Sequence, residues 1–77
     1  MTEVTFPEMS REKADAVGLL ATWYAAAGEQ VAAGQLIAEA QMDKVDAEIE
    51  APIAGTITLL VEEGAEVAQG APIARIG

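Results

Sequence analysis

Residues 28–38 run Gly28-Glu29-Gln30-Val31-Ala32-Ala33-Gly34-Gln35-Leu36-Ile37-Ala38, and residues 64–74 repeat the pattern as Gly64-Ala65-Glu66-Val67-Ala68-Gln69-Gly70-Ala71-Pro72-Ile73-Ala74. The offset between the copies is constant at 36 residues. Each copy places two glycines around one valine. This frame suits a turn, a very short strand and a second turn, because glycine supplies the positive φ that such turns need. The repeat predicts two similar halves.

The segments ahead of the two copies are also alike. Gly18-Leu19-Leu20-Ala21-Thr22-Trp23-Tyr24 precedes the first copy, and Gly55-Thr56-Ile57-Thr58-Leu59-Leu60-Val61 precedes the second. Threonine, isoleucine, valine and aromatic residues favour strands. We therefore expect an all-β domain over residues 1–77: a flattened barrel or sandwich of two similar four-stranded halves, related by pseudo-two-fold symmetry and packed face to face.

Helix propensity favours a different fold for residues 11–27. This stretch is rich in good helix formers, and Ala14, Val17, Ala21 and Tyr24 could form an apolar stripe at helical spacing. The alternative is a small acidic helical bundle. The glycines of the repeat argue against it, because glycine destabilises a helix interior.

Between the two halves, residues 36–50 alternate in polarity on both sides of a centre. The apolar members of this alternation are Leu36, Ala38, Ala40, Met42, Val45, Ala47, Ile49 and Ala51. Period-two alternation is typical of half-buried strands, so Met42 to Val45 is a candidate hairpin turn. A turn without glycine suggests negative φ at both central positions, as in type I. That geometry would point Lys44 outward.

Lys44 is the residue with the strongest functional interest. It is either an ordinary solvated turn lysine or a functional one. Two observations favour function: the chain has only one other lysine, Lys13, and Lys44 lies at the junction of two similar halves among acidic residues.

Composition excludes several classes of function. The 77 residues include 13 acidic and 4 basic side chains, for a net charge of −9. This charge argues against nucleic acid and anionic membrane as partners, or it simply keeps the domain soluble. The chain has no Cys and no His, and Ser10 is its one serine. No catalytic residues or metal site are therefore expected. The chain is not an enzyme by itself, and a reactive atom would come from a cofactor.

The sequence shows neither a transmembrane segment nor a signal peptide. No run of about 18 apolar residues is present, so no transmembrane helix is expected. The start, Met1 to Val4, lacks the features of a signal peptide. The expected location is the cytoplasm, or the mitochondrial matrix in a eukaryote.

The overall arrangement resembles the lipoyl and biotinyl carrier domains. The residues that match the family's spacing before its modified lysine are Gly28, Val31, Ile37, Ala40, Lys44 and Val45. The resemblance spans nearly the whole chain, from Val4-Thr5-Phe6-Pro7-Glu8-Met9 to Glu50-Ala51-Pro52-Ile53-Ala54-Gly55. Biotinyl domains usually carry Ala-Met-Lys-Met, whereas lipoyl domains carry Asp-Lys-Ala or Asp-Lys-Val. Met42-Asp43-Lys44-Val45 is therefore similar to the lipoyl branch.

The sequence departs from the family pattern in two places. The family often has Gly-Glu in its first loop, where this chain has Ser10-Arg11-Glu12, which leaves the conformation of residues 8–16 open. Residues 55–64 are also one residue shorter than usual, which leaves the register of that strand open.

The resemblance implies that Lys44 carries covalently attached lipoate. The domain would then shuttle acyl groups and reducing equivalents within a 2-oxoacid dehydrogenase complex, as part of a dihydrolipoamide acyltransferase. It implies three partners: a thiamine-diphosphate-dependent decarboxylase, a dihydrolipoyl dehydrogenase, and a lipoate-protein ligase or lipoyl transferase. Asp43, Val45, Met42 and Asp46 would help the ligase and partners recognise the turn. Glu12 to Asp15 are either a further recognition loop or plain solvated chain.

Three other functions stay open at this stage. A biotin carboxyl carrier domain shares the fold, with biotin on Lys44. An acyl carrier protein would need an Asp-Ser-Leu motif, which Met9-Ser10-Arg11 does not match. An unmodified interaction domain could retain the carrier fold without using Lys44.

Overall fold

The computed structural model describes residues 1–9 and 16–77, and its elements there are all β-strands. They are β1 (Thr2–Thr5), β2 (Val17–Trp23), β3 (Gln30–Val31), β4 (Leu36–Met42), β5 (Val45–Glu50), β6 (Gly55–Leu59), β7 (Glu66–Ala68) and β8 (Pro72–Ile76). The described part contains no helix, so the helical alternative is wrong over residues 16–27. Val17 and Tyr24 are about half exposed there and form no buried stripe.

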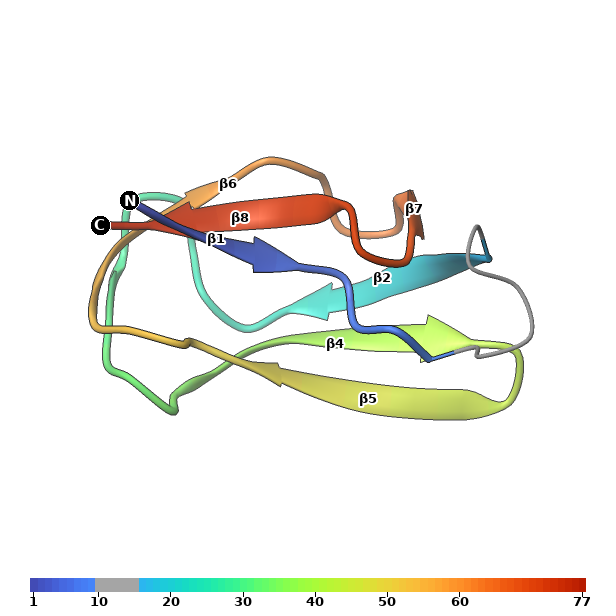
Figure 1. Ribbon diagram of the computed structural model, residues 1–77. Helices are drawn as coiled ribbons and strands as arrows, with labels where there is room; N and C mark the ends of the chain where they lie inside the picture. The colour runs from blue at the N-terminus through green and yellow to red at the C-terminus, as the bar shows by residue number, and fades with distance from the viewer. Residues whose placement is uncertain (10–15) are drawn as a thin grey trace.

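The strands form two four-stranded sheets that make a sandwich, as the sequence predicted (Figure 1). The strand orders are β1-β8-β6-β3 and β5-β4-β2-β7, and every pair is antiparallel. The sheets do not coincide with the halves of the chain. Each sheet takes two strands from the first half and two from the second, so the halves interlock.

The two copies of the repeat have the same backbone geometry. Gly28 and Gly64 have φ of 82° and 87°, and Gly34 and Gly70 both have φ of 83°. The Gly28 amide donates to the Ile57 carbonyl and the Gly64 amide to the Leu20 carbonyl, both at 2.8 Å. These matched turns confirm the predicted pseudo-two-fold symmetry and explain why glycine recurs at these positions.

The symmetry extends to two β-bulges. Ile37 has no partner where Leu36 pairs with Glu50 and Ala38 with Ile49, and Ile73 is skipped in the same way between β1 and β8. Both isoleucines are fully buried. Simple alternation placed Ile37 on the polar side, which is wrong, because a bulge shifts the side-chain alternation by one residue.

A third bulge has no counterpart in the other half. Ala21 is the extra residue of β2, since Leu20 pairs with Ala40 while Thr22 pairs with Glu39. The equivalent strand β6 pairs with β8 without interruption, from Ile57 to Leu59. Residues 55–64 are therefore shorter because β6 lacks a bulge residue, and the register of β6 with β8 is unaffected.

The core between the sheets is apolar throughout the described part. Its largest fully buried side chains are Phe6, Leu20, Ile37, Ile57, Ile73 and Ile76. No polar or charged side chain is buried there. The partly buried Trp23 packs against this core and donates its Nε1–H to the Val61 carbonyl at 3.1 Å. The groups available for chemistry in this part of the chain lie on the surface.

The candidate functional site at the hairpin turn

The β4–β5 hairpin projects the candidate lysine from one end of the molecule. Met42 pairs with Val45 in register, which leaves Asp43 and Lys44 as a two-residue turn, as predicted. The chain termini lie at the opposite end (Figure 1), where Thr2 pairs with Ile76. The longest extent of the molecule is 34 Å, so the turn lies far from both termini.

The turn differs from the predicted type I geometry. Asp43 has φ of +54°, and it is the one non-glycine residue with positive φ in the described ranges. Positive φ at the first central position matches the right-handed twist of the flanking strands, which a type I turn would splay apart. Aspartate tolerates this region better than most residues, because its short polar side chain can hydrogen-bond locally.

Lys44 is exposed and unpaired with the rest of the described chain. The ion pair found there joins Arg75 to Glu3 at 3.7 Å, and no described hydrogen bond involves the Lys44 amine. Acylation of this amine would therefore break no hydrogen bond or ion pair with the described residues. The arrangement suits attachment of a carboxylic acid through an amide.

The four predicted recognition residues do not share one environment. Asp43 and Asp46 are exposed, and Val45 is 58% exposed even though the alternation grouped it with buried residues. Val45 lies beyond the end of the core, while Ile49 further along β5 is buried. Met42 is only 9% exposed, so most of its side chain belongs to the core. The predicted contribution of Glu12 to Asp15 lies outside the described residues.

The base of the hairpin is closely packed. Phe6 is fully buried, and its ring lies against Gly18 of β2. A Cβ added at Gly18 would lie 2.7 Å from Phe6 Cε1 and 2.9 Å from the Gln41 carbonyl oxygen, so no other residue fits without movement. This packing gives the turn a firm support.

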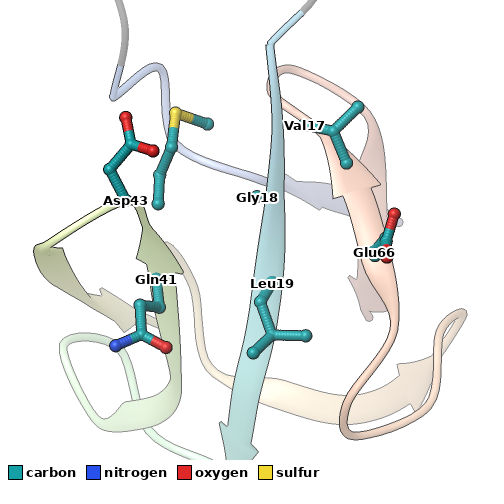
Figure 2. Close-up of a pocket in the computed structure, with 7 residues that line it drawn as sticks. Val17, Gly18, Leu19, Gln41, Asp43 and Glu66 are labelled. Carbon is teal, nitrogen blue, oxygen red and sulfur yellow. The ribbon is translucent and has the colours of Figure 1, made fainter.

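Beside the turn, a shallow hollow of about 380 Å³ opens over β2, β4 and β7 (Figure 2). The described residues that line it are Val17, Gly18, Leu19, Gln41, Met42, Asp43 and Glu66. This hollow was not predicted from the sequence, because the patterns around Val17 and Leu19 indicate only a strand or a helix. The outward-facing apolar residues on alternate positions of β2 were the available signal.

Comparison with known proteins agrees with this geometry. The family model described as "Biotin-requiring enzyme", which covers biotin and lipoyl attachment domains, matches residues 2–76. The solved lipoyl domain of the 2-oxoglutarate dehydrogenase complex from Azotobacter vinelandii superimposes with a TM-score of 0.79 and 29% sequence identity. The superposition covers 100% of this chain and 96% of that one. The chain belongs to the biotin/lipoyl carrier family, and its fold is that of a lipoyl domain.

The relatives of this lipoyl domain are much longer proteins. The chain is 40% identical over 77 residues to the acetyltransferase component of the pyruvate dehydrogenase complex from Corynebacterium glutamicum. It is 36% identical over 78 aligned positions to the succinyltransferase component of the 2-oxoglutarate dehydrogenase complex from Staphylococcus saprophyticus. The match covers 99% and 100% of this chain but only 11% and 18% of those proteins. The chain therefore corresponds to one short segment of these longer relatives.

Acidic residues lie along the hairpin that carries the lysine. Glu39 and Glu48 lie directly opposite each other on β4 and β5. The Tyr24 hydroxyl donates to Glu39 Oε2 at 3.4 Å. The charge of Glu39 raises the pKa of the Tyr24 phenol above its ordinary value of 10.0, with smaller contributions from desolvation and from Glu48. This face of the lipoyl domain suits a partner with a basic surface.

The described ranges hold neither a metal-binding cluster nor a membrane-spanning helix. No group of three or more acidic, Cys or His side chains is arranged there to hold a metal ion. No helix capable of crossing a membrane occurs in the same part of the chain.

Proposed function

We propose that Lys44 is the lipoate attachment site, and that this lipoyl domain is the swinging-arm carrier of a 2-oxoacid dehydrogenase complex. The observation that carries the proposal is Lys44 at the tip of a two-residue hairpin turn in a lipoyl-domain fold, where it is exposed and has no ion-pair partner among the described residues. The sequence Asp43-Lys44-Val45 supports lipoate over biotin.

The residues of the hairpin fit the group. Amide formation removes the Lys44 charge without stranding a described counter-ion, because the amine has no ion-pair partner there. When bound, lipoate supplies a disulfide that can be reduced and acylated, which a chain without cysteine cannot supply. The domain itself holds the attachment point outward on a rigid base, and Asp43 fixes the direction of the turn.

The partners proposed for this carrier follow from its relatives. The named relatives belong to pyruvate and 2-oxoglutarate dehydrogenase complexes. We infer a lipoate ligase or lipoyl transferase, a thiamine-diphosphate-dependent decarboxylase and a dihydrolipoyl dehydrogenase as partners. Tethering raises the local concentration of the carried group at each active site to roughly millimolar.

The experiment is co-expression of the domain with a lipoate ligase or with a biotin ligase, followed by intact mass measurement. We expect lipoyl addition to the wild type and to Lys13→Arg, and none to Lys44→Arg. Lys13→Arg is the matched control, because these are the only two lysines. Biotin addition without lipoyl addition, or lipoylation of Lys44→Arg, would overturn the proposal.

A further inference from the structure

The hollow beside the turn combines an apolar floor with an acidic rim. Leu19 of β2 lies between Gln41 of β4 and Glu66 of β7, in one row across three strands (Figure 2). Val17 lies two residues further along β2 on the same face and is 54% exposed. An exposed valine and a partly buried leucine on the same face of β2 form a small apolar surface that is open to solvent.

The charge of the lining restricts what the hollow can bind. Asp43 and Glu66 contribute two carboxylates, and none of the described residues that line the hollow is basic. Free fatty acids, phosphates and acyl-coenzyme A are anionic, so this rim repels them. A neutral ligand with an apolar body and an amide N–H for a carboxylate suits the lining better. A lipoylated lysine has these properties, since its amide is uncharged and its chain and ring are apolar.

The hollow is also within reach of Lys44. Asp43, its neighbour in the chain, is part of the lining. Leu19 pairs with Gln41, so it lies about three residues along β4 and one strand across, or roughly 11 Å from Lys44. About eleven consecutive bonds join the lysine Cα to the lipoyl ring. Nearly four residues of extended backbone contain the same number of bonds, so the extended arm is roughly 12 Å long.

We propose that the hollow is a resting site for the lipoyl group that Lys44 of the same domain carries. This inference depends on the proposed attachment of lipoate to Lys44. Tethering presents the ring to the hollow at a local concentration of about 1 mM, so even a contact with millimolar affinity keeps it docked about half of the time. Docking would shield the ring between visits to partner active sites, and a partner would have to withdraw it.

The test compares lipoylated and unmodified wild-type domain by NMR, with intact mass confirming the modification. We expect amide shift changes at Val17, Leu19 and Glu66 on lipoylation, and nuclear Overhauser contacts between ring protons and the Leu19 methyls. Domain octanoylated at Lys44 serves as a control for the chain without the ring. Shift changes confined to residues 43–45, without such contacts, would overturn the resting site while leaving the attachment intact.

Variants of the lining sharpen the test. Val17→Thr and Leu19→Thr each place a β-branched strand former at the position and remove apolar surface. We expect each to weaken the lipoylation-dependent shift changes about two-fold, in line with a site that is half occupied. Leu60→Thr is the matched control, because Leu60 is 40% exposed and lies outside the hollow. Undiminished shift changes in both lining variants, or changes that arise only after decarboxylase is added, would contradict the proposal. Changes that need the decarboxylase would indicate that the hollow binds the decarboxylase and not the lipoyl ring.

Discussion

Asp43 holds the left-handed backbone conformation on which the hairpin turns, with φ of +54°. Asparagine adopts this conformation readily, whereas a β-branched residue does so at a cost of roughly 1–2 kcal/mol. We expect Asp43→Asn to keep the free energy of unfolding near that of the wild type, and Asp43→Val to lower it by about that amount. Urea denaturation measures both. Asp46→Val is the control in an exposed strand position, and equal losses in the two valine variants would contradict the role of Asp43.

Gly18 and Gly28 are required for different physical reasons. At Gly18 an added Cβ meets the Phe6 ring and the Gln41 carbonyl, whereas at Gly28 nothing lies within 4 Å but φ is +82°. Gly18→Ala should lower the free energy of unfolding by about 1–3 kcal/mol through overpacking. Gly28→Ala should cost about 1–2 kcal/mol through backbone strain.

Asparagine distinguishes the two glycines, since it relieves strain at positive φ but not crowding. Thermal and urea denaturation should show Gly28→Asn recovering most of the loss and Gly18→Asn losing more than Gly18→Ala. Recovery at Gly18 would show that the Phe6 contact is not what requires glycine there.

At the scale of elements, β4 and β5 carry a repulsive pair. Glu39 and Glu48 are opposite each other, and like charges in this arrangement destabilise a hairpin. Tyr24 reports on the pair, because Glu39 raises the pKa of its phenol. Glu39→Gln should return that pKa towards 10.0, as followed by ultraviolet absorbance during titration. Glu63→Gln, on a different loop, should leave the Tyr24 pKa unchanged.

The same interaction has a defined effect on stability. The folded state holds the phenol proton more tightly than the unfolded chain does. The Tyr24 phenol therefore contributes fully to the free energy of unfolding below its pKa in the unfolded chain. This contribution is lost as pH rises through the higher pKa of Tyr24 in the folded state. Glu39→Gln should reduce this alkaline loss of stability, and an undiminished loss in the variant would show that the interaction between Tyr24 and Glu39 is not its source.

Local patterns of the sequence predicted the elements better than their distortions. The glycine frame and the alternation of residues 36–50 predicted the strands and the position of the turn, because both reflect backbone requirements of single segments. The bulges at Ala21, Ile37 and Ile73 could not be predicted, since each depends on pairing with a distant strand. The positive φ of Asp43 was not predicted, because turn propensity reflects the turn residues alone and not the twist of the two flanking strands. The hollow required the neighbouring positions of β2, β4 and β7, which only the fold provides.

At the scale of the whole molecule, pseudo-symmetry makes paired substitutions comparable. Ile37 and Ile73 are equivalent bulge residues, and both are 0% exposed. Replacing either with alanine should lower the free energy of unfolding by about 2–5 kcal/mol, a large fraction of the stability of a domain this small. We expect the two losses to agree within about 1 kcal/mol in urea denaturation. A much smaller loss at one position would show that the halves do not contribute equally to the core.

Pseudo-symmetry also relates the two ends of the sandwich. β4 and β5 correspond to β8 and β1 in the other sheet. The position equivalent to the Asp43–Lys44 turn therefore lies next to the pair Thr2 and Ile76. The hairpin turn and this pair thus occupy symmetry-related places at opposite ends of the domain.

The net charge of −9 affects the stability of the whole molecule as well as its partners. At 0.01 M salt the Debye length is about 30 Å, which exceeds the 19 and 18 Å widths of the molecule, so each carboxylate repels nearly all the others. At 0.15 M the Debye length falls to about 8 Å and only near neighbours interact. The melting temperature should therefore rise by a few degrees between these salt concentrations at neutral pH. Glu48→Gln should reduce this rise, because it removes one charge from the most crowded acidic pair. A melting temperature that falls with added sodium chloride would mean that attractive pairs such as Arg75–Glu3 outweigh the repulsion.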